Sequence, residues 1–129
     1  MQHEFPVRVY YEDTDMAGIV YHANYLKFIE RARSEWVKGM GIDQNALREH
    51  EGVVFVIRRI EADFRASARF DDELVVQTRV QSVSGVRLVL HQEVQRAGEA
   101  LFTAEVTLVS MTLDGQPTRL PQELRRKVH

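Results

Sequence analysis

The periodicity of apolar residues changes once along this chain, near Gly52, and that change limits the folds open to it. From Tyr21 to about Met40, apolar residues recur every three or four positions, which predicts one amphipathic helix. The apolar positions of this helix are Tyr25, Phe28, Ile29, Ala32, Trp36 and Met40. After Gly52, apolar and polar residues alternate, as is typical of strands. The sequence therefore predicts one long helix followed by a sheet.

Turn signals divide the alternating region into strands. They lie at Asp71-Asp72, Ser84-Gly85, Ala97-Gly98-Glu99 and Asp114-Gly115. The connections that separate the predicted strands Val86 to Gln95 and Leu101 to Met111 are short enough for hairpins, so these strands are expected to be antiparallel neighbours. Phe5 to Tyr11 also alternates and predicts an earlier strand, which Pro6 directs toward a sheet edge. We therefore expect an α+β fold, a curved antiparallel sheet of about five strands wrapped around one long central helix.

Two shorter segments complete the prediction. Ile42 to His50 is expected to form a second, short helix with Asp43 as its N-cap, ended by Gly52. The tail Glu123 to Lys127 is expected to be a solvated end.

Composition excludes several classes of function. A length of 129 residues suits a single domain spanning 1–129. The absence of cysteine excludes disulfides and thiolate nucleophiles, and a net charge of −2 provides no field for binding nucleic acid. No secretion signal or membrane-spanning run is visible, so we expect a cytoplasmic protein without membrane insertion. The five histidines are scattered without ligand spacing, so no metal site is expected. We also expect no cofactor.

One helix covers only one face of such a sheet. Whichever of Val75, Val89, Phe102 and Val106 lie on the face turned away from the helix would be exposed in a monomer. We therefore expect a homo-oligomer.

The segment Glu12 to Val20 places carboxylates directly before the predicted helix. Helix N-termini carry unpaired N–H groups and a partial positive charge, so the backbone from Val20 to Asn24 can hold an oxyanion while Asp13 or Asp15 acts beside it. That arrangement suits a hydrolase. The alternative is a merely polar turn in which Gly18 supplies a positive φ.

Three blocks of sequence resemble one family. They are Val9–Tyr25, Phe28–Arg33 and Ala62–Asp72, and together they resemble the hot-dog-fold acyl-CoA thioesterases, in the branch of YbgC-like proteins and 4-hydroxybenzoyl-CoA thioesterases. The resemblance implies a hot-dog fold, an acyl-CoA substrate, and homo-oligomers: dimers with paired active sites at the interface, and commonly tetramers (dimers of dimers).

The resemblance also implies roles for residues in the first block. It assigns the reacting carboxylate to Asp15, and polarisation of the thioester carbonyl to the backbone N–H of His22. Asp15 then either attacks the carbonyl to form an anhydride or takes a proton from an attacking water. Gly18 is expected to set the loop geometry. One oxyanion donor is typically worth about 3 kcal/mol in the transition state, so the His22 N–H is expected to matter more than the helix dipole.

Further residues are candidates for substrate binding. Tyr21 and Tyr25 are expected to pack or to line the acyl pocket, and Asp13 to orient the loop by accepting backbone N–H bonds. Arg87 and Arg119 are candidates for contacting the coenzyme A phosphates. The basic cluster that some relatives carry before the fourth strand is replaced here by Ser82–Val86.

Two alternatives to a thioesterase stay open. Hot-dog hydratases and dehydratases use a histidine with a carboxylate, and the side chain of His22 keeps that chemistry available. A non-catalytic hot-dog module that binds acyl carrier protein or an envelope-associated complex is the other.

Overall fold

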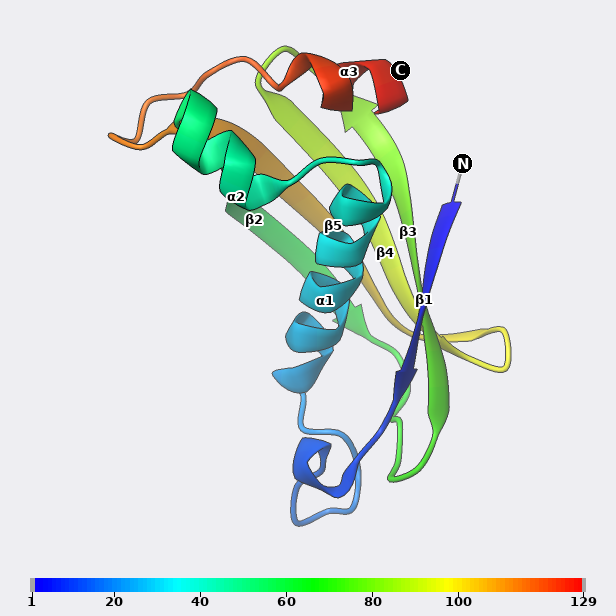
Figure 1. The fold of residues 1–129 in the computed structure, drawn as a ribbon. Helices are drawn as coiled ribbons and strands as arrows, with labels where there is room; N and C mark the ends of the chain where they lie inside the picture. Colours follow the sequence, from blue (N-terminus) through cyan, green and yellow to red (C-terminus); the bar gives the residue numbers. More distant parts are fainter. Residues whose placement is uncertain (1, 129) are drawn as a thin grey trace.

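The computed structural model describes residues 2–128, which form one antiparallel sheet and the helices packed around it (Figure 1). The strands are β1 (Gln2–Arg8), β2 (Val53–Phe64), β3 (Glu73–Val83), β4 (Arg87–Arg96) and β5 (Glu99–Thr112). Their order in the sheet is β1-β3-β4-β5-β2. The expected five-stranded sheet and the hairpins β3–β4 and β4–β5 are confirmed.

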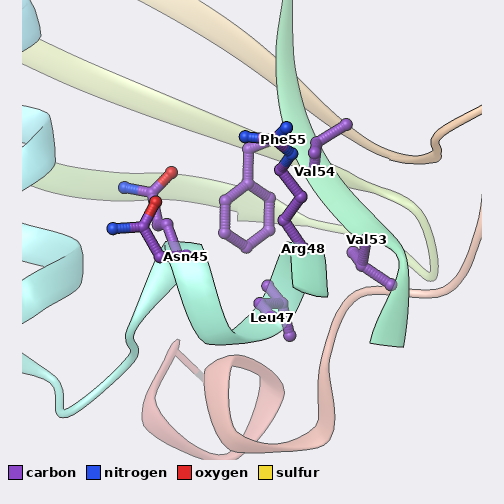
Figure 2. A pocket seen from close by; sticks show the side chains of 7 residues that line it. Asn45, Leu47, Arg48, Val53, Val54 and Phe55 are labelled. Atoms are coloured by element: carbon purple, nitrogen blue, oxygen red, sulfur yellow. The ribbon is translucent and has the colours of Figure 1, made fainter. Parts of the chain in front are cut away.

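The predicted long helix is α1 (Asn24–Gly39), which lies across the concave face of the sheet (Figure 1). The shorter helical segments are the 3₁₀ turn η1 (Tyr11–Asp13), α2 (Gln44–Ala46), the π-helical turn η2 (Leu47–Glu51) and α3 (Gln122–Val128). The expected second helix is confirmed as α2 with η2, and the Asp43 carboxylate accepts the Ala46 N–H at 3.1 Å. This short helical unit lies against the start of β2 (Figure 2).

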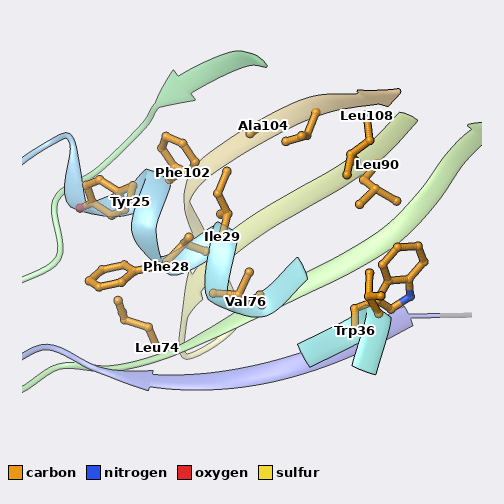
Figure 3. Packing of buried hydrophobic residues seen from close by; sticks show 14 of the residues in the cluster. Tyr25, Phe28, Ile29, Trp36, Leu74, Val76, Leu90, Phe102, Ala104 and Leu108 are labelled. Atoms are coloured by element: carbon orange, nitrogen blue, oxygen red, sulfur yellow. The ribbon is translucent and has the colours of Figure 1, made fainter. Parts of the chain in front are cut away.

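The core forms between α1 and the inner face of the sheet. Phe28, Ile29 and Ala32 on the helix are almost fully buried, as their spacing predicts. They pack with side chains from the central strands, among them Leu74, Val76, Leu90, Phe102, Ala104 and Leu108 (Figure 3). Burial of this apolar stripe fixes α1, and with it the position of the helix N-terminus.

A short row of polar side chains crosses the middle of this core. Gln92 on β4 donates to the Ile29 carbonyl at 3.0 Å and to the Thr78 hydroxyl at 2.9 Å. Its amide oxygen accepts from Arg33 at 3.0 Å, and burial lowers the pKa of the Arg33 guanidinium. These bonds satisfy polar groups that burial would otherwise penalise, and they hold α1 in one position along the sheet.

Two expectations about the sheet and the tail are wrong. The tail is not a solvated end, because residues 122–128 form α3 and Leu124 is only 1% exposed. Of the four apolar candidates for the face turned away from α1, Phe102 and Val106 are buried against α1, and Val75 and Val89 are half-buried on the other face. The first strand ends at Arg8, and Tyr10 and Tyr11 leave the sheet to enter η1.

No helix in the described part of the chain is long and apolar enough to cross a membrane.

Candidate active site

The loop between β1 and α1 is held by Asp13. The Asp13 carboxylate accepts the Tyr10 N–H at 2.8 Å, and its carbonyl accepts the Tyr21 N–H and the Asn24 side-chain amide, both at 2.9 Å. These bonds tie η1 to the first residue of α1. Asp13 lines neither of the cavities described below, so in this structure it orients the loop.

Asp15 lies at the exposed tip of this loop in a tight turn. Its Oδ1 accepts the Ala17 N–H at 2.9 Å, its carbonyl accepts the Gly18 N–H at 3.0 Å, and its N–H donates to the Ile19 carbonyl at 3.0 Å. Gly18 has a φ of +77°, the left-handed region that glycine adopts without strain. Within residues 2–128 no donor bonds Asp15 Oδ2, so one carboxylate oxygen remains available to a substrate.

The N-terminus of α1 supplies the complementary donors. Ala23 is the N-cap residue, and no side chain caps the helix. Neither the His22 nor the Ala23 N–H donates a hydrogen bond within the described residues. Such N–H groups, with the partial positive charge of the helix end, favour a bound anion.

A cavity of about 280 Å³ brings the carboxylate and this helix end together. Its lining comprises Asp15, Ile19, Val20, His22, Tyr25, Phe64, Arg65, Ala66 and Ser67. The resemblance assigns the reaction to Asp15 and His22, and the structure places both residues in one cavity. A second cavity of about 670 Å³ is lined by Tyr11, Thr14, Asp15, Met16, Gly18 and Phe70. Asp15 is the residue common to both.

Tyr25 forms a buried part of the lining of the first cavity. Its ring is 3% exposed and stacks on Phe102 with the centroids 5.1 Å apart, and Phe64 packs edge-on against both rings. The Tyr25 hydroxyl accepts the Ala68 N–H at 2.9 Å, and the Ala68 carbonyl accepts the Val20 N–H at 2.9 Å. Burial raises the pKa of Tyr25, so its phenol stays protonated. Tyr25 thus fastens the loop that carries Asp15 through Ala68.

The segment that carries Ala68 is anchored by an ion pair. Asp72 accepts from Arg96 and from the Arg69 N–H, both at 2.8 Å, and Arg96 also donates to the Ser67 carbonyl at 3.2 Å. Burial alone raises the pKa of Asp72, but the bond from Arg69 and the contact with Arg96 outweigh burial, so the pKa is lowered.

Some of the predicted binding residues lie away from Asp15. Tyr21 is 46% exposed and packs on the His22 ring, and it lines neither cavity. Arg87 is the first residue of β4. Val94, seven residues later on the same strand, pairs with Phe102, which stacks on Tyr25. At about 3.3 Å per residue, Arg87 therefore lies roughly 23 Å from the Tyr25 end of the strand. Arg119 follows β5 and its carbonyl accepts from Ser110 near the same distant end. Within one chain, therefore, neither arginine is brought to Asp15.

Phe64, which the sequence alone did not single out, and Arg65, one of several arginines on predicted strands, are residues of the candidate site. Both line the cavity of Asp15, although Phe64 is 55% exposed. Their location in the block Ala62–Asp72 that carries the family resemblance was the available signal. No group of three or more His, Asp or Glu side chains in the described range is arranged to hold a metal ion.

Comparison with known families identifies the fold and the family. A family model described as the thioesterase-like superfamily matches residues 9–128. The chain belongs to this superfamily. It is 39% identical over 126 residues to the acyl-CoA thioesterase YbgC of Haemophilus influenzae, which covers 97% of this chain and 93% of that protein.

Solved structures of the superfamily agree with this assignment. A probable thioesterase from Bartonella henselae superposes with a TM-score of 0.89 at 38% identity, covering 94% of this chain and 100% of that one. A 4-hydroxybenzoyl CoA thioesterase mutant, complexed with 4-hydroxybenzoyl CoA, superposes with a TM-score of 0.93 at 20% identity, covering 99% of each chain. This second likeness concerns the fold alone, which is the hot-dog fold.

Proposed function

We propose that this protein is an acyl-CoA thioesterase that hydrolyses acyl-CoA to a free acid and coenzyme A. The observation that carries the proposal is the shared cavity of Asp15 and the uncapped N-terminus of α1. Asp15 and His22 line the same cavity, and within residues 2–128 neither the Asp15 Oδ2 nor the His22 N–H has a hydrogen-bond partner. A carboxylate beside an N–H donor is the pairing that acyl transfer needs. The thioesterase name of the relative that is 39% identical supports the same conclusion.

In the proposed reaction the thioester carbonyl oxygen accepts the His22 N–H. Charge that develops on this oxygen is stabilised by the N–H and by the helix end. The Asp15 carboxylate then attacks the carbonyl carbon, the coenzyme A thiolate leaves, and water hydrolyses the mixed anhydride. In the second route Asp15 takes a proton from a water that attacks the same carbon. Both routes use one carboxylate and the same donor. Gly18 sets the loop conformation that positions the Asp15 carboxylate relative to the His22 N–H.

We propose that Tyr25 and Phe64 form the apolar wall of the acyl site. Phe64 packs edge-on against the stacked rings of Tyr25 and Phe102, and its exposed part borders the cavity of Asp15.

A hydratase-like use of the His22 side chain lacks its acidic partner on α1, since Glu30 bonds Ser34 at 2.6 Å and Glu35 is exposed on the outer side of the helix. The same proposal includes three further points. The chain forms a single hot-dog domain (1–129), it assembles as a homo-oligomer, dimer or tetramer, and it is located in the cytoplasm.

The test is release of free thiol from a panel of acyl-CoAs with short, long and aromatic acyl groups. We expect turnover of at least one class, and the ranking reports which acyl group the site accepts. Rapid quenching and mass spectrometry separate the two routes, because an acyl adduct on Asp15 supports direct attack. Absence of thiol release from every substrate, with binding of coenzyme A retained, would instead favour a binding module.

A further inference from the structure

Three large apolar side chains are exposed together beside Asp15. They are Tyr11 in η1, Met16 in the turn that carries Asp15, and Phe70 before β3, and each is more than half exposed. Single apolar residues are common on protein surfaces and need no explanation, whereas a group that lines one cavity marks a binding surface. These three side chains are called the apolar rim below. The loop between β1 and α1 that carries part of it lies at the opposite end of the molecule from α3 (Figure 1).

Backbone hydrogen bonds bring Tyr11 and Phe70 together. The Asp71 N–H donates to the Val9 carbonyl at 2.9 Å, and the Val9 N–H donates to the Asp72 carbonyl at 3.0 Å. The chain after β1 therefore runs beside the segment before β3. The rings of Tyr11 and Phe70 meet edge-on with their centroids 6.4 Å apart, a favourable geometry for two aromatic rings. Two sides of the apolar rim are thus fixed relative to each other.

Met16 completes the apolar rim from the tip of the turn. The Gly18 N–H donates to the Asp15 carbonyl at 3.0 Å, and the Ala17 N–H donates to the Asp15 carboxylate at 2.9 Å. These bonds close the turn around Asp15 and leave the Met16 side chain fully exposed. A methionine side chain is unbranched and flexible, so it adapts to apolar ligands of different shape.

The apolar rim lines the second cavity, and Asp15 lines both cavities. The second cavity has a volume of about 670 Å³, whereas the first has about 280 Å³. Sites that enclose a small organic ligand typically measure about 300–1,000 Å³. The first cavity is therefore large enough only for a small acyl group. An acyl chain that is held at Asp15 and exceeds the first cavity extends into the second.

The second cavity does not have the chemistry of a site for a phosphorylated carrier. Of the residues that line it, all within 2–128, only Asp15 carries a charge, and that charge is negative. The Thr14 hydroxyl in this lining already donates to the Tyr11 carbonyl at 2.7 Å. Phosphate groups are bound by lysine or arginine and are repelled by a carboxylate. A hydrocarbon chain, in contrast, gains by leaving water for contact with methionine and aromatic rings.

We propose that the second cavity binds the distal part of an unbranched aliphatic acyl chain, and that Met16 and Phe70 set the preference for chain length. The thioester carbonyl is held at Asp15, the first carbons of the chain contact Phe64 in the first cavity, and the later carbons pack on the apolar rim. This inference rests on the proposed thioesterase function and adds to it the class of acyl group, a long aliphatic chain in preference to a short one.

The kinetic test is thiol release from butanoyl-, hexanoyl-, octanoyl- and decanoyl-CoA. In the wild type we expect kcat/KM to rise with chain length, by up to about fourfold for each methylene group that leaves water. Met16→Gln keeps the length of the side chain and replaces its apolar end by an amide. We expect this variant to lower the ratio of kcat/KM for decanoyl-CoA to kcat/KM for butanoyl-CoA by about tenfold, and Phe70→Ala to lower the same ratio by at least as much.

Leu113→Gln is the matched control, because Leu113 is an exposed apolar residue in the turn after β5. Phe102, beside Tyr25, and the end of β5 are separated by a stretch of strand that spans roughly 30 Å. We expect the wild-type ratio in this variant. The wild-type ratio in Met16→Gln and Phe70→Ala as well would refute the acyl subsite. Absence of thiol release from every substrate would refute the proposed function instead, and the subsite is then decided by binding.

Binding is measured by NMR on protein labelled at the methionine methyl groups. The chain has four methionines, and the Met16 signal is the one that Met16→Gln removes. The probe is 1-decanol, which has no charge for Asp15 to repel, and 1-butanol is the control ligand. We expect only 1-decanol to shift the Met16 signal, and the Met111 signal, from the distant end of β5, to stay in place. No shift at Met16, or an equal shift at Met111, would contradict binding at the apolar rim.

The competing occupant of the apolar rim is a second copy of the chain. Light scattering at equal protein concentration compares the mass of the wild type with the masses of Met16→Gln and Phe70→Ala. We expect equal masses, because the rim binds the acyl chain and not a neighbouring subunit. A smaller mass for both variants would assign the rim to a contact between copies and would overturn the proposal.

Discussion

Replacement of Tyr25 by phenylalanine removes one oxygen atom from the support of the reacting loop. The ring remains stacked on Phe102, so little apolar contact is lost. The Ala68 N–H, on a residue that is 0% exposed, loses its acceptor at 2.9 Å. A buried donor left without a partner costs about 1–3 kcal/mol. For a domain of this size that loss lowers the melting temperature by roughly 3–15 °C.

The same change reaches the active site, because Ala68 also bonds Val20 in the loop that follows Asp15. We expect kcat to fall while the helical and sheet content stays native. Urea denaturation and thiol release measure the two effects on one preparation. Tyr21→Phe is the matched control, since the Tyr21 ring is 46% exposed and such changes usually stay within about 0.5 kcal/mol. If Tyr25→Phe is as stable and as active as Tyr21→Phe, the support assigned to the Tyr25 hydroxyl is refuted.

Two further perturbations address the loop and its anchor. Gly18→Ala is expected to lower the free energy of unfolding, measured by urea titration, by about 1–2 kcal/mol and to lower kcat, because φ at Gly18 is +77° and the new methyl group meets conformational strain but no neighbouring atoms. The control is Gly39→Ala at the end of α1, which is expected to leave the free energy of unfolding unchanged or to raise it. Asp72 has a lowered pKa in the folded protein, so its stabilising effect is present above about pH 4 and is lost as the pH falls through the folded pKa. Asp72→Asn is therefore expected to be less stable than wild type at pH 7 and to lose less stability between neutral and acid pH. If the free energy of unfolding falls by the same amount with decreasing pH in both proteins, the stabilising role assigned to the Asp72 carboxylate is ruled out.

The local elements were predictable because each depends on neighbours in sequence. The stripe that includes Phe28 and Ile29 predicts α1, and Asp43 predicts the start of α2. Turn signals such as Ser84-Gly85 predict the hairpins. In these cases propensity, pattern and turn chemistry agree.

The order of the sheet and the lining of the site depend on contacts that are distant in sequence. The pairing of β2 with β5 brings Phe64 beside Phe102, and nothing local to either residue indicates this. Leu124 in the tail is buried only because α3 returns to the core. The prediction of a solvated tail followed its charges and overlooked this one apolar residue. Arg87 and Arg119 were likewise predicted from residue type and, for Arg119, from approximate alignment; within the chain both lie near the end of the sheet that is distant from Asp15.

The central claim is that the Asp15 carboxylate carries the reaction, and a pair of isosteric variants tests it most directly. Asp15→Asn keeps the Ala17 N–H bond and removes the charge, whereas Asp13→Asn makes the same change in a carboxylate that only accepts the Tyr10 N–H. The measurement is kcat for thiol release from the best acyl-CoA, with folding verified by circular dichroism. We expect a loss of about 10²–10⁴-fold for Asp15→Asn and less than about tenfold for Asp13→Asn. Equal rates for Asp15→Asn and the wild type would contradict the mechanism.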